Sequence, residues 1–163
     1  MIIQTQPAIA PPQGALSAAQ AEVARLQARR MRDLPTLYRA AVERADGAAM
    51  ASLRREVLDL EEHIAAATVV VARCAVAVAA TGVAEATAAM EEAQRQMASQ
   101  QAEALRIRSD PARTPREYSE ASRTLELAPG SVRGAGHAVA QAQQRHTEAS
   151  QALRDVIGAL SLG

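Results

Sequence analysis

The stretch LRREVLDLEEHIAAATVVVARCAVAV, residues 53–78, decides the fold. Apolar side chains recur along it at alternating spacings of four and three residues, a heptad pattern typical of a helix that packs along one seam. The seam positions are Leu53, Val57, Leu60, Ile64, Ala67, Val71, Cys74 and Val78. This pattern predicts a long helix and, with it, an all-α fold.

The same pattern resumes one residue late beyond Thr81-Gly82 and continues to Ile107. Averaged over residues 53–107, the apolar positions recur about every 3.6 residues, which is the period of a straight helix. We therefore predict one continuous helix over residues 48–108. The alternative is a helical hairpin that turns at Thr81-Gly82, but no proline is present there and the loop would be very short.

Residues 64–84 are apolar on every side of this predicted helix, with Arg73 as the one charge. A helix that is apolar all round is normally buried all round, either in protein or in a membrane. A charge at the centre of a membrane span costs about 2.5–3.5 kcal/mol, so no membrane is expected. A β-strand over the valines is a further alternative, but the chain offers no second strand to pair with it. We expect Arg73 to pair with a carboxylate from another helix or another subunit, since no acidic residue lies between His63 and Glu85.

Shorter helices are expected on both sides, at residues 17–32 and 34–46 before the long helix and at 115–127 and 132–160 after it. Thr114-Pro115-Arg116-Glu117 is the sharpest local signal, because Thr suits the N-cap, Pro the first turn and Glu the third position. Pro129-Gly130 is expected to end the fourth helix. Together these elements predict a single helical domain over 17–163, an elongated bundle or coiled coil with one long central helix.

Residues 1–16 are predicted to form an extended N-terminal arm. Its prolines disfavour a helix, and the region from Met1 to Gly14 carries no charge. The absence of a basic segment also argues against a signal peptide, so a cytoplasmic location, or a particle assembled in the cytoplasm, is expected. Ile2, Ile3 and Ile9 are expected to latch onto the bundle or a neighbouring subunit.

A second heptad seam follows in the last predicted helix, and one polar residue, His146, lies on it. Polar seam residues often fix the register or oligomeric state of a coiled coil, and imidazole also titrates near neutral pH. The full set of predicted interface residues is Ile2, Ile3, Ile9, Leu53, Val57, Leu60, Ile64, Val71, Arg73, Val78, Val139, His146, Leu153, Val156 and Leu160.

No residue pattern points to catalysis, a cofactor or a metal. The chain has no phosphate-binding loop, and the position three residues before His146 is Gln143 rather than the glutamate of helical metal sites. Asp59 and His63 share a helix face, but that face is an ordinary charged surface. The single cysteine, Cys74, cannot form an internal disulfide. The formal net charge is zero, so nucleic acid is not an expected partner.

Composition points to a structural role. Alanine makes up about a quarter of the chain, while Phe and Trp are absent, so one copy can build only a thin core. We therefore expect a non-enzymatic, homo-oligomeric structural subunit of a larger repeated assembly, of which a bacteriophage virion or neck component is one example. The alternative is a helical binding module, such as a secretion chaperone, adaptor or regulator.

Overall fold

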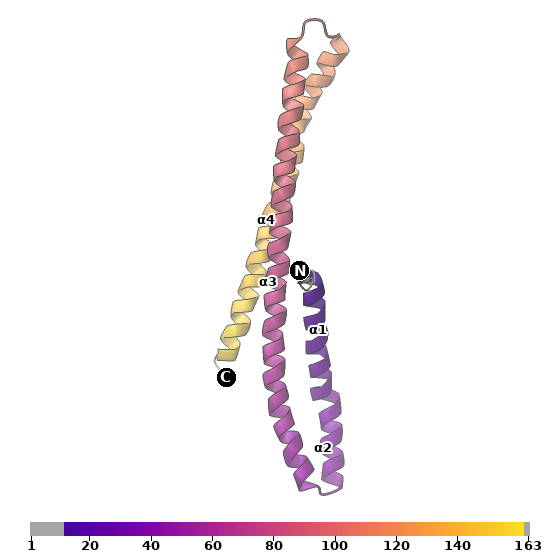
Figure 1. Ribbon diagram of the computed structural model, residues 1–163, viewed down its shortest axis with the longest axis vertical. Helices are drawn as coiled ribbons and strands as arrows, with labels where there is room; N and C mark the ends of the chain where they lie inside the picture. Colours follow the sequence, from indigo (N-terminus) through magenta and orange to yellow (C-terminus); the bar gives the residue numbers. More distant parts are fainter. Residues whose placement is uncertain (1–11, 162–163) are drawn as a thin grey trace, which may run out of the picture. The chain divides into compact units, whose positions relative to one another are not determined.

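The computed structural model describes residues 12–161, and the elements of this range are all helical (Figure 1). The elements are α1 (Pro12–Ala28), the π-helical turn η1 (Arg29–Asp33), α2 (Leu34–Glu43), α3 (Gly47–Ser109) and α4 (Pro115–Ser161). The predicted all-α fold with one long helix is confirmed. The contacts group the described residues into two units: unit 1 contains residues 12–78 and 149–161, and unit 2 contains residues 79–148.

Helix α3 runs without interruption through Thr81-Gly82, as predicted. A single glycine inside a helix lowers its stability by only about 1 kcal/mol relative to alanine. The neighbouring alanines have the highest helix propensity and keep the segment helical. Space is not the reason for this glycine, because a Cβ atom added to Gly82 would meet nothing within 4 Å.

The N-terminal helix extends further towards the N-terminus than predicted, since residues 12–16 are already helical. Proline is tolerated in the first turn of a helix, where an amide donor is not needed, so Pro12 is compatible with helix at this point. Ser17 consequently lies inside α1. The rest of the predicted arm, including Ile2, Ile3 and Ile9, falls outside the described residues.

The predicted break between the first two helices is replaced by the π-helical turn η1. The Leu34 amide donates to the Arg29 carbonyl, five residues back, and Asp33 keeps helical backbone angles. In a regular α-helix the ring of Pro35 would clash with the carbonyl of Met31. A wider turn immediately before the proline lets the helical backbone continue past it.

The turn between α2 and α3 begins earlier than predicted, since α2 ends at Glu43 rather than at residue 46. The residue with a left-handed backbone is Ala45, with φ of 52°. The Asp46 side chain accepts a hydrogen bond of 2.9 Å from the Ala49 amide and so caps the start of α3. The capping aspartate thus directly precedes α3, which begins at Gly47.

Helix α4 passes through Pro129-Gly130, so the predicted stop there is wrong. The side chains on either side of the proline explain the continuation, because Ala128 is buried and Val132 is half-buried on neighbouring turns of one face. Most helical stability in proteins comes from packing of one face rather than from local propensity. Packing on both sides of Pro129 therefore outweighs its local effect.

In unit 1, α1, η1 and α2 lie along the first half of α3 (Figure 1). Leu26, Leu34 and Leu60 form the buried cluster between them, each less than 10% exposed. Half-buried side chains of α3 pack against it, namely Leu53, Val57, Ile64 and Ala67. Ion pairs of Arg29 with Glu56 and of Arg30 with Glu61 flank the cluster, but they are solvent-exposed and contribute little stability.

In unit 2, the end of α3 and the start of α4 form an antiparallel hairpin (Figure 1). Its buried residues are all alanines: Ala104, Ala121 and Ala128. Alanine lets two helices approach closely but removes little apolar area from water. The core of this hairpin is therefore thin.

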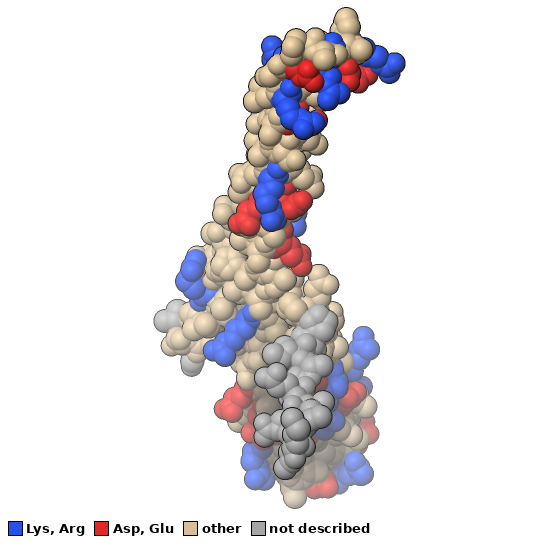
Figure 2. Space-filling model, turned by 45° about the horizontal axis from the view of Figure 1, so that its top comes forward, with Lys and Arg blue, Asp and Glu red and all other residues tan. Residues whose placement is uncertain are grey.

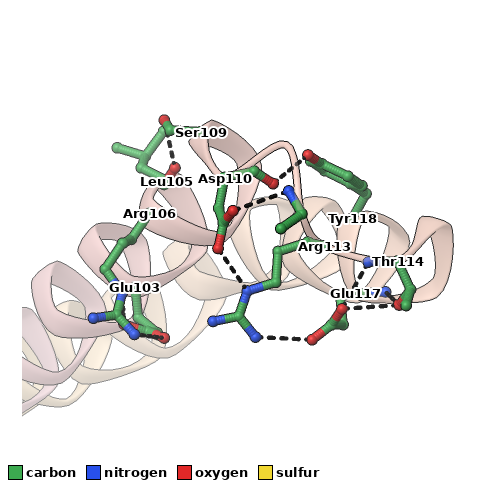
Figure 3. Close-up of polar contacts among 10 residues, drawn as sticks. Glu103, Leu105, Arg106, Ser109, Asp110, Arg113, Thr114, Glu117 and Tyr118 are labelled. Carbon is green, nitrogen blue, oxygen red and sulfur yellow. Dashed lines mark hydrogen bonds and ion pairs between the residues drawn. The ribbon is translucent and has the colours of Figure 1, made fainter.

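The predicted loop and helix cap at the hairpin tip are confirmed (Figure 3). The Glu117 carboxylate accepts hydrogen bonds from the Thr114 amide at 2.8 Å and from the Thr114 hydroxyl at 2.9 Å. Arg113 bridges the Asp110 and Glu117 carboxylates, and the Tyr118 hydroxyl donates to the Asp110 carbonyl at 2.6 Å. These bonds fix both ends of the short loop.

Acid should loosen this tip. The Thr114 amide and hydroxyl, followed by Arg113, lower the pKa of Glu117 from its ordinary value of 4.5 to about 2. Because the folded-state pKa is the lower one, the stabilisation is present above pH 4.5 and is lost as pH falls from 4.5 towards 2. We expect NMR titration of the Glu117 carboxyl to show this low midpoint, and Thr114→Ala to move it upward. A midpoint near 4.5 in the unmodified chain would contradict the cap geometry.

Candidate interaction surfaces

The first four residues of the predicted α3 interface are engaged within the chain. Leu60 is buried, and Leu53, Val57 and Ile64 pack with it against Leu26 and Leu34. The heptad pattern correctly identified a packing face. Its partner here is the N-terminal helical segment of the same chain.

The next part of α3, residues 64–84, is only partly covered. Every residue in this stretch is half-buried or exposed, Val71 and Val78 are half-buried, and the Val70 side chain is 48% exposed. The all-round burial expected for this stretch is not supplied by the described part of the chain. α3 contains an 18-residue window that is long and apolar enough to cross a membrane by length and composition, with none of that window buried.

Arg73 lies in the middle of this stretch and is exposed. Among residues 12–161, none forms an ion pair or hydrogen bond with its guanidinium. The expected partner carboxylate is therefore not provided by another of the described helices. A partner from another subunit stays a prediction.

The side chains of the predicted seam of α4 are only partly buried. Val139 and His146 in unit 2, and Leu153 and Val156 in unit 1, are half-buried, whereas Leu160 is exposed. Ile157, next to this seam and also exposed, was not among the predicted interface residues. The end of α4 thus presents apolar side chains to solvent.

An apolar groove in unit 1 was not predicted from the sequence. Its volume is about 580 Å³, and residues from η1, α2 and the first half of α3 line it. The lining residues are Arg30, Met31, Leu34, Pro35, Tyr38, Leu53, Arg54, Val57 and Leu58. Two of them are unusually exposed for their size, Met31 at 71% and Leu58 at 62%. The sequence contains one indication of this groove: Met31 and Leu58 are large apolar residues that do not lie on the predicted seams.

Charged side chains do not form a large patch of one sign on the face shown in Figure 2, where acidic and basic residues lie close together. Among the described residues, no group of three or more His, Cys, Asp or Glu side chains is placed to hold a metal ion. A shallow pocket of unit 2 between α3 and α4 contains Glu103, Glu117 and Glu120. Of these, Glu103 is paired with Arg106, and Glu117 belongs to the helix cap.

The surfaces that stand out are therefore apolar: the middle of α3, the end of α4 and the groove of unit 1. Comparison with known proteins adds no assignment, since no family model, no curated protein and no solved structure matches this chain.

Proposed function

We propose that this protein is a non-enzymatic structural subunit of a larger assembly built from repeated copies of the chain. The observation that carries the proposal is the apolar stretch of α3, residues 64–84, which the described part of the chain covers only in part. Large apolar surfaces that the chain does not cover usually mark contact sites for protein or membrane. Neighbouring subunits would bury this stretch and add to the alanine core of unit 2.

Protein is a better partner for this stretch than a lipid bilayer. Arg73 lies near its centre, and a central arginine costs about 2.5–3.5 kcal/mol on insertion into a membrane. In a protein interface, the same arginine can pair with a carboxylate of another subunit. Alanines, which fill much of the stretch, favour close helix–helix packing between subunits.

A bacteriophage virion or neck component is one assembly that fits, by analogy with general architecture. The chain would then be found in the cytoplasm or in a particle assembled there. The predicted seam residues Val71, Val78, Val139, His146, Leu153, Val156 and Leu160 are proposed to contribute to subunit contacts, with the latch residues Ile2, Ile3 and Ile9.

A helical binding module is the second candidate, and the groove of unit 1 favours it. A volume of about 580 Å³ with an apolar lining is suited to a short peptide of another protein. Native mass spectrometry of the purified protein separates the two candidates. Integer multiples of the 17.2 kDa chain support the assembly, whereas a monomer or dimer bound to a different polypeptide supports the binding module.

A further inference from the structure

One exposed strip of α3 in unit 1 carries two opposite charges with an apolar centre between them. The exposed strip consists of Glu62, Ala66, Val70 and Arg73. These residues recur at spacings of four, four and three, so they follow one side of the helix. All four are exposed, and Val70 is 48% exposed. The strip is therefore a surface that the described residues leave open.

Neither charge of the exposed strip has a partner within residues 12–161. The Glu62 carboxylate and the Arg73 guanidinium make no ion pair or hydrogen bond there. By contrast, the adjacent Glu61 is paired with Arg30. Glu62 and Arg73 cannot pair with each other, because 11 residues of helix place them about 17 Å apart along its axis. Both charges are thus available to a molecule that packs on this strip.

We propose that a second copy of the chain packs antiparallel along the exposed strip, with Glu62 of each copy against Arg73 of the other. A two-fold axis between Ala66 and Val70 produces this register. Ala66 of one copy then lies opposite Val70 of the other, and Glu62 lies within one residue of the level of Arg73. A two-fold interface repeats every contact, so both charge pairs form. The inference rests on the proposed function and deepens it, because it names the surface, orientation and register of one subunit contact.

The charges of the strip select this orientation. Parallel copies in register would place Arg73 against Arg73 and Glu62 against Glu62, and like charges that face each other weaken an interface. In the antiparallel pair both ends attract, and the exposed Asp59, one turn before Glu62, adds a carboxylate to the acidic end. No acidic residue lies between His63 and Glu85, so the facing stretch of the second copy brings no carboxylate that would repel Glu62.

Charge reversal in the full chain tests this register. Glu62→Arg alone makes both pairs doubly positive, and Arg73→Glu alone makes both pairs doubly negative. We expect each variant to weaken self-association at least about tenfold in sedimentation across a concentration series. Mixing the two variants, or combining both substitutions in one chain, restores opposite charges in both pairs. Either should return the association to within about threefold of that of the unmodified chain.

Glu91→Arg is the matched control, because Glu91 is an exposed glutamate of the same helix outside the strip. Combined with Arg73→Glu, it should not restore association, and restoration by Glu91→Arg instead of Glu62→Arg would overturn the inference. Association unchanged by Glu62→Arg and by Arg73→Glu, in protein that still assembles, would also overturn it and leave the proposed function standing. An unmodified protein that is monomeric would remove the proposed function and the inference together.

Discussion

Replacing Leu60 with alanine is expected to destabilise unit 1 by about 2–5 kcal/mol, the usual range for a buried leucine that leaves a cavity. Leu60 is only 6% exposed and forms one buried cluster with Leu26 and Leu34. Thermal and urea unfolding followed by circular dichroism would measure the loss.

Leu105→Ala provides the control for this change, because the same atoms are removed from an exposed position of the same helix. Its effect should stay within about 0.5 kcal/mol. If Leu60→Ala were as mild as Leu105→Ala, the cluster that joins α1, α2 and α3 would not hold unit 1 together.

Val70→Glu is expected to weaken self-association by about a hundredfold or more. Val70 is exposed in the apolar stretch of α3, and the proposed neighbouring subunit would have to bury the new carboxylate at a cost of several kcal/mol. Because Val70 is 48% exposed and does not belong to the buried cluster of the described residues, helix content should remain unchanged. Sedimentation across a concentration series, with circular dichroism on the same samples, would measure both.

Leu105→Glu is the matched charge control, since it places the same group on α3 outside residues 64–84. Assembly that survives Val70→Glu unaltered would show that this stretch is not a subunit contact. Weakening by both variants to the same extent would point to a general effect of charge rather than to this surface.

The elements that could be predicted were those with dense, consistent local signals. The 3.6-residue apolar period set the length of α3, since no proline competes with it, and the Thr114–Glu117 cap formed as its residue types indicate. The start of α1 was placed too late, because prolines disfavour a helix interior but are tolerated in its first turn. Pro129 was misjudged for a similar reason, because Ala128 and Val132 fix one face of α4 on both sides of it.

The candidate surfaces were harder to predict. A heptad seam shows which side chains will be covered but not which helix covers them, so Leu53, Val57, Leu60 and Ile64 could not be assigned to a partner within the chain. The groove depends on where η1 and α2 lie against α3, and this position follows from the π-helical turn before Pro35. Such a turn has no clear signature in a single sequence.

Sedimentation equilibrium of the purified, unmodified chain tests the central claim most directly, because it reports mass independently of shape. If the apolar middle of α3 is a subunit contact, the mass at micromolar concentration should correspond to two or more chains of 17.2 kDa each. A single species of 17.2 kDa that stays soluble and folded at these concentrations would contradict the proposal that the chain is a subunit of a repeated assembly.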